Sequence, residues 1–432
     1  MERGCQLYNT YVEILKRELV CAQGCTEPIA IAYCAAVARS VLGAIPDRIE
    51  IEASGNIIKN VKSVVVPGTN GGRGVGVAAA IGVLGGDEKA LLEVIKSVPQ
   101  EAKERLGAYV EATPITLIPV DRGVVLDIGI IAHKGDSYAK VRIANEHTNI
   151  VLIEKDGQVL QEASTEAQAP AEDTPDYTLL SVEAIYDFAT TCDLADVKET
   201  LDRQIAMNCA ISDEGMRGSW GANIGKTLIH YVGTDVRTRA KARAAAGSDA
   251  RMSGCELPVV INSGSGNQGM TASLPVIEYA RDMGVGDEMM YRALLISNLL
   301  TTHAKTSIGR LSAYCGAVSA GAAAGAGVAF LHGGGVDEIS HTLVNALAVT
   351  SGIVCDGAKP SCAAKIAMAV EAGLFGHEMY RQGQQFYGGD GLVKKGVENS
   401  IRSFGRLGRL GMKQTDEEII RMMTEEIGRA HV

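Results

Sequence analysis

Apolar residues recur at helical spacing in the first part of the chain. Residues 6–20 carry them on one face, and residues 28–42 carry them nearly all round. The first pattern predicts an amphipathic helix and the second a buried one. Pro28 suits the first turn of that second helix, and Cys25 comes just before it. The sequence therefore predicts that Cys25 lies at the N-terminus of a buried helix, where backbone N–H groups favour a thiolate and lower its pKa. A buried structural cysteine in the turn is the alternative.

The hydrophobic period then changes to two, which is typical of strands. Residues 48–53 alternate, and residues 61–67 form a Val-rich run that predicts a second strand. Three further strands are expected near residues 124–131, 138–143 and 149–154. We therefore expect an α+β architecture, with an N-terminal α/β domain of mixed strands over residues 1–177. Its last part, residues 161–177, is acidic and rich in Ala, Thr and Pro, and is interpreted as a linker.

From residue 178 the pattern is helical almost throughout, with Gly- and Ser-rich breaks that mark helix ends. We expect a mainly α-helical second domain over residues 178–432. The run from residue 313 to residue 331 is rich in Gly and Ala but too weakly hydrophobic to insert into a membrane.

Composition narrows the classes of partner. The 432 residues carry a formal net charge of −10, and only 4% are aromatic. An acidic chain with few aromatic residues argues against nucleic acid or an anionic membrane as partner. The N-terminus lacks the apolar core of a secretory signal, so a cytoplasmic protein is expected. The oligomeric state stays open, a homodimer included.

The candidate chemistry begins with cysteines. Cys355 and Cys362 bracket a turn that contains Gly and Pro, and Cys315 lies about 40 residues upstream. Thiolates on turns beside Gly- and Ala-rich helices suit a soft inorganic group. The spacing matches neither a zinc ribbon nor a ferredoxin, so taken alone the two later cysteines are equally compatible with structural thiols. Zinc at the same thiolates is a further alternative.

Two Gly-rich loops are candidate anion sites. Residues 68–76 contain Asn70 and precede an Ala-rich helix, which suits a carboxylate, a phosphate or a purely structural turn. Residues 263–269 contain a GxGxxG pattern without the alternating strands and helices of a dinucleotide fold. We interpret this second loop as a binder of a small substrate carboxylate. The candidate substrate-binding residues are Asn56, Asn70, Ser263, Ser265, Asn267, His303 and Lys305, and the last two have structural or solvated roles as alternatives.

Several short motifs together resemble one known family. They are GCTEPIA at residues 24–30, SGN at 54–56, GTNG at 68–71, SGSGNQG at 263–269, CGA at 315–317 and CDGAKPSC at 355–362. The combination resembles the L-cysteine desulfidase family, which is similar to the α chain of the iron–sulfur L-serine dehydratases. The resemblance covers essentially the whole chain.

The resemblance implies a [4Fe–4S] cluster held by Cys315, Cys355 and Cys362, with one iron left open to the substrate. It also implies that Cys25 transfers a proton and that no pyridoxal phosphate is used. In the related dehydratases a C-terminal cysteine can occupy the open iron, but this chain ends in Gly-Arg-Ala-His-Val. The expected reaction is β-elimination from L-cysteine to give pyruvate, ammonia and sulfide. The alternatives are the same chemistry on L-serine and a non-catalytic iron–sulfur sensor.

Overall fold

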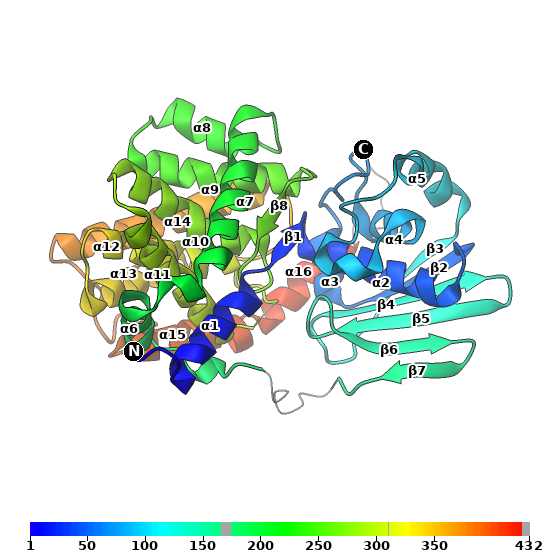
Figure 1. Ribbon diagram of the computed structural model, residues 1–432, viewed down its shortest axis with the longest axis horizontal. Helices are drawn as coiled ribbons and strands as arrows, with labels where there is room; N and C mark the ends of the chain where they lie inside the picture. The colour runs from blue at the N-terminus through cyan, green and yellow to red at the C-terminus, as the bar shows by residue number, and fades with distance from the viewer. Residues whose placement is uncertain (166–173, 310, 426–432) are drawn as a thin grey trace.

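The computed structural model describes residues 1–165, 174–309 and 311–425. Figure 1 shows two parts side by side, a sheet with helices on one of its faces and a larger assembly of helices. This mixture of strands and helices agrees with the expected α+β class. Residues 166–173 of the predicted linker at residues 161–177 lie outside the described residues.

The first part contains one mixed sheet with the strand order β3-β2-β4-β5-β6-β7. Only β2 and β3 run parallel, and the other neighbours are antiparallel. The strands are β2 (Arg48–Ala53), β3 (Ile115–Pro119), β4 (Asp127–Lys134), β5 (Ser137–Ala144), β6 (Ile150–Lys155) and β7 (Gln158–Glu162). The covering helices are α2 (Thr26–Leu42), α3 (Gly55–Val61), α4 (Gly74–Gly85) and α5 (Gln100–Ala112).

The alternation in β2 explains why only one face of the sheet is covered. Ile49 and Ile51 are buried, whereas Glu50 and Glu52 lie on the opposite face. The predicted strand over residues 61–67 is wrong. Val61 ends α3, and the following Val-rich run packs as irregular chain with a single bridge to Arg73. A Val-rich run becomes a strand only where a neighbouring strand can accept its hydrogen bonds.

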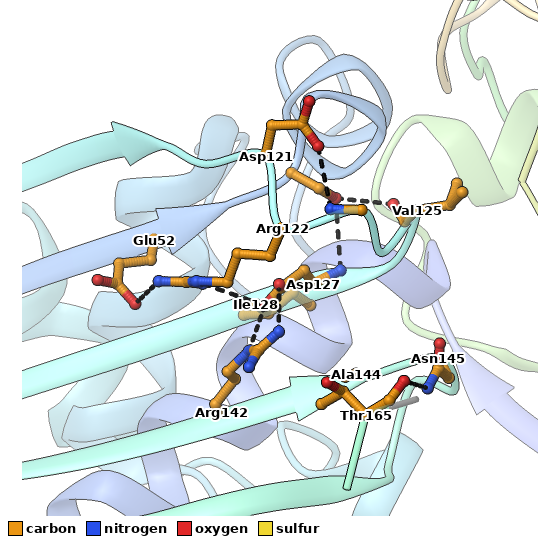
Figure 2. A network of polar contacts seen from close by, with 12 residues as sticks. Glu52, Asp121, Arg122, Val125, Asp127, Ile128, Arg142, Ala144, Asn145 and Thr165 are labelled. Atoms are coloured by element: carbon orange, nitrogen blue, oxygen red, sulfur yellow. Dashed lines mark hydrogen bonds and ion pairs between the residues drawn. The ribbon is translucent and has the colours of Figure 1, made fainter. Parts of the chain in front are cut away.

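Figure 2 shows the ionic network around Asp127, the first residue of β4. Asp127 is completely buried and accepts two hydrogen bonds from Arg142, at 2.8 and 2.7 Å. Arg122 lies between Asp127 and Glu52. Bidentate pairing compensates the cost of burying this carboxylate. The backbone N–H of Asp127 also reaches the hydroxyl of Ser54, at 3.4 Å, which fixes the entry to α3.

The second part is helical, as expected, and is built around α12 (Gly316–Leu331), whose residues beyond Gly316 are all buried. Gly325 and Gly373 allow close contact of α12 with α14 (Ser361–Arg381), since a Cβ atom on Gly325 would lie 2.3 Å from the carbonyl oxygen of Gly373. The remaining helices are α6 (Val182–Thr191), α7 (Lys198–Arg217), α8 (Ile224–Tyr231), α9 (Val236–Met252), α10 (Gly266–Asp282), α11 (Asp287–Thr306), α13 (Val336–Thr350) and α15 (Val397–Arg406). Across the described residues, none of the helices combines the length and the apolar character that crossing a membrane requires.

Both ends of the chain connect the two parts. Helix α1 (Gln6–Glu18) packs in the helical core, and β1 (Cys21–Gln23) pairs with the short strand β8 (Pro258–Val260). At the other end α16 (Lys413–Glu425) lies against α3, as Figure 1 shows. Helix α1 and strand β1 therefore pack with the helical part.

Candidate active site

One pocket lies where the two parts meet, and several helices begin at it. Its lining includes the first residues of α2, α10, α12 and α14. Cys25 is the N-cap of α2 and Cys315 the N-cap of α12, and neither side chain caps its own helix. The unpaired N–H groups of helix N-termini favour negative charge. The pocket encloses about 100 Å³ and is suited to an anionic group.

Three thiols from separate segments line this pocket. A short antiparallel bridge between Tyr314 and Val354 sets Cys315 beside Cys355. Cys362 follows in the first turn of α14. Gly357, between the two later cysteines, has φ +93°, and a Cβ atom there would lie 2.3 Å from the carbonyl oxygen of Lys59. Glycine is therefore required for the loop 355–362 to pack against α3.

The thiols affect one another. Burial, and after it the charges of Cys355 and Cys362, raise the pKa of Cys315 to about 12. Burial also raises the pKa of Cys362. Within residues 1–165, 174–309 and 311–425, no three His, Cys, Asp or Glu side chains are arranged to bind a single metal ion.

Cys25 faces this set of thiols from the other part of the chain. Its Sγ donates to Oε2 of Glu27 at 3.0 Å, and Asn60 donates to Oε1 of the same carboxylate, also at 3.0 Å. Burial and then the charge of Glu27 raise the pKa of Cys25 well above its usual value. The prediction of a lowered pKa at the helix N-terminus is therefore wrong, because loss of hydration and the adjacent carboxylate outweigh the helix dipole.

Glu27 is the ionised member of this pair. Burial alone would raise its pKa, but the charge of His147, the hydrogen bond from Cys25 and the charge of Arg251 hold the pKa below its usual value. A thiol and a carboxylate in direct contact can exchange a proton. The arrangement provides a proton donor and a proton acceptor beside the three other thiols.

Comparison with known proteins shows the family of this chain. The serine dehydratase alpha chain family model matches residues 89–421, more than half of the chain. The chain belongs to the serine dehydratase alpha chain family. Relatives that match nearly end to end include a UPF0597 protein of Desulfitobacterium hafniense, 57% identical over 99% of both chains. A UPF0597 protein of Lachnoclostridium phytofermentans is 49% identical, over 96% of this chain and 100% of its own.

Membership of the serine dehydratase alpha chain family implies a dehydratase-like lyase. The printed names of these relatives state no substrate.

Most of the site residues predicted from the sequence of this family member lie around one pocket. Those that line it are Cys25, Ser263, Ser265, Asn267, Lys305, Cys315, Cys355 and Cys362. Three others do not line it. Asn56 donates to Asp416 at 2.7 Å, Asn70 is exposed in a turn, and His303 lies 2.7 Å from Glu398.

The sequence reasoning missed several pocket residues of this family member. They are Arg251, Asn60, His147, Gln268 and Tyr314. Tyr314 and Gln268 adjoin predicted residues and could have been found by their position. Arg251 and Asn60 lie within ordinary helical patterns, and no spacing in the sequence distinguishes them.

Proposed function

We propose that this protein is an iron–sulfur-dependent β-eliminating lyase that converts L-cysteine to pyruvate, ammonia and sulfide. Cys315, Cys355 and Cys362 would hold a [4Fe–4S] cluster, and Cys25 would transfer the proton. A cluster with one iron free of cysteine would act as a Lewis acid toward the leaving sulfur atom. The proposal requires no pyridoxal phosphate.

The observation that carries the proposal is the convergence of Cys25 with three thiols of another part of the chain. The donor set consists of soft thiols at or near helix N-termini, whose unpaired N–H groups suit an anionic cluster. Since the pKa of Cys315 is raised to about 12, its thiol is protonated until metal binds. Metal binding then releases the proton, as it does for other thiolate sites.

The residues of the pocket also support a proton path. In the resting site the thiol of Cys25 carries its proton and donates to Glu27. Transfer of that proton to the carboxylate would leave a thiolate that can accept the Cα proton of the substrate. The pair of electrons from the broken Cα–H bond forms the Cα–Cβ double bond, and the β-substituent leaves. The aminoacrylate product then becomes an imine and takes up water to give pyruvate and ammonia.

The decisive experiment combines composition with turnover. The protein is purified without oxygen, and iron and acid-labile sulfide are quantified. Pyruvate and sulfide are then measured with L-cysteine, and pyruvate with L-serine. We expect iron and sulfide in the protein and turnover of L-cysteine. Pyruvate from L-serine alone would assign the alternative, an L-serine dehydratase of the same mechanism, which the family description favours.

Two variants separate the proposed roles of the cysteines. Cys25→Ala should lose turnover and keep its iron, whereas Cys362→Ser should lose iron. Cys34 is also a buried cysteine but lies outside the pocket, so Cys34→Ala is the matched control and should keep both. Loss of iron in Cys25→Ala would make Cys25 a ligand. Zinc without acid-labile sulfide would refute the cluster, and a cluster without turnover would favour a sensor.

A further inference from the structure

Four side chains of the pocket carry a buried polar atom without a hydrogen-bond partner among the described residues. They are Nη2 of Arg251, the hydroxyl of Tyr314, Oε1 of Gln268 and Oδ1 of Asn60. Each of these residues is at least nine-tenths buried. A buried polar atom without a partner costs free energy, so its presence in several side chains of one pocket indicates a bound ligand that satisfies them.

The guanidinium of Arg251 is held in place by its other atoms. Nε donates to the carbonyl oxygen of Gly24 at 2.8 Å, and Nη1 donates to Oδ1 of Asn267 at 3.1 Å. Arg251 is only 2% exposed. These two hydrogen bonds fix the plane of the guanidinium and leave Nη2 as a rigid cationic donor in the pocket. Gly24, which holds Nε, is the residue before Cys25.

The orientation of Asn60 is also determined. Its Nδ2 must donate to the carboxylate of Glu27, because a carboxylate only accepts hydrogen bonds when ionised. The carbonyl oxygen Oδ1 is therefore the free atom, and it can only accept. The pocket thus presents a cationic donor held by Gly24, the residue before Cys25, and an acceptor held by Glu27.

We propose that Arg251 and Asn60 position the amino-acid substrate, with Arg251 binding its α-carboxylate and Asn60 accepting a hydrogen bond from its α-ammonium. Tyr314 is placed to add a donor for the carboxylate, and Gln268 an acceptor for the ammonium. This inference rests on the proposed function and deepens it, because it assigns two residues of the pocket to the charged groups of the proposed substrate. Amides, amines and simple carboxylic acids would each leave one buried group unsatisfied.

The first test needs no variant. L-Alanine has both charged groups but no β-leaving group, so its binding can be measured by calorimetry without turnover. L-Alaninamide lacks the carboxylate and propionate lacks the ammonium. We expect each to bind to the anaerobically purified protein at least tenfold more weakly than L-alanine, as for loss of one charge-assisted hydrogen bond. Equal binding of L-alanine and L-alaninamide would overturn the proposal.

Variants then assign the two contacts. Arg251→Gln should weaken L-alanine binding about tenfold to a hundredfold and abolish the preference for L-alanine over L-alaninamide. Asn60→Leu should reduce the preference for L-alanine over propionate. Arg251→Lys retains the charge and should bind with intermediate strength. The control is Arg243→Gln on the same helix, since Arg243 pairs with Asp213 outside the pocket.

The outcomes separate this inference from the proposed function. Selective L-alanine binding without iron or turnover would support the amino-acid site and refute the lyase. Turnover with full L-alanine affinity and selectivity in Arg251→Gln would support the lyase and refute the role of Arg251.

Discussion

The contact between α16 and α3 contains a buried ion pair whose two ends should respond unequally to mutation. Lys59 on α3 lies 2.5 Å from Asp416 on α16, and the side chain of Lys59 is 1% exposed against 14% for Asp416. Nζ of Lys59 also donates to the carbonyl oxygen of Cys355 at 3.4 Å. The pair therefore connects the C-terminal helix with the loop that carries two of the proposed cluster ligands.

Removal of the Asp416 carboxylate should lower the free energy of opening α16 more than removal of the Lys59 ammonium. In Asp416→Ala the ammonium of Lys59 keeps only the weak Cys355 contact, and an unpaired buried charge costs about 3–5 kcal/mol. In Lys59→Met, Asp416 retains the hydrogen bond from Asn56 at 2.7 Å and can turn toward solvent. We therefore expect a loss of stability of about 2 kcal/mol. The double variant should cost less than the sum of the single changes, by about 1–3 kcal/mol.

Because α16 is the last described helix, the cost should appear as local opening, which hydrogen–deuterium exchange measures. This loss of about 3–5 kcal/mol should make the amides of residues 413–423 exchange about 150- to 5000-fold faster in Asp416→Ala. The control is Lys96→Met, since Lys96 pairs with Glu93 at 53% exposure and such pairs contribute less than about 1 kcal/mol. Equal exchange in Asp416→Ala and wild type, or strictly additive effects, would refute the reasoning.

Three further predictions concern other parts of the fold. Gly357→Ala should lower the iron content after anaerobic purification, because a Cβ atom would collide with α3, while Gly352→Ala, where a Cβ atom meets open space, should not. Gly325→Ala should lower the melting temperature by forcing α12 and α14 apart, at a cost of about 1–3 kcal/mol, and Gly335→Ala is the matched control. Burial raises the pKa of Asp249 from 3.8 to about 6, so the folded protein binds this proton more tightly than the unfolded chain. The protonated Asp249 therefore stabilises the fold below its unfolded pKa, and about 3 kcal/mol of this stability is lost as the pH rises through its folded pKa. Thermal melts of Asp249→Asn across this pH range should lack that loss. A pH dependence of stability in Asp249→Asn equal to that of the wild type would contradict the assignment.

Local patterns in the sequence predicted much of the fold because they depend on neighbours along the chain. The helix after Cys25 begins at Thr26, and the predicted strand over residues 48–53 has those bounds. The failure over residues 61–67 has a different cause. That run has the composition of a strand, but only the tertiary structure decides whether another strand lies beside it.

The candidate site divides in the same way. The sequence indicated the thiols and the Ser263–Gly269 loop, since each has a local signature, and the structure places them around one pocket. Arg251 and Asn60 have no such signature, because a buried arginine and a surface arginine look alike in a helical pattern. Asn56, Asn70 and His303 show the converse, since suitable residue types near a motif do not imply a common site.

By itself the sequence determined which segments are helical, where helices begin and which soft ligands are available, because these depend on residue type and spacing. The tertiary structure alone decided that α2, from one part of the chain, presents Cys25 to thiols from the other. The tertiary structure also determined the direction in which the pKa of Cys25 is shifted. A helix N-terminus lowers a thiol pKa in water, but burial beside an ionised Glu27 reverses the sign, because desolvation and a close charge are stronger than the helix dipole.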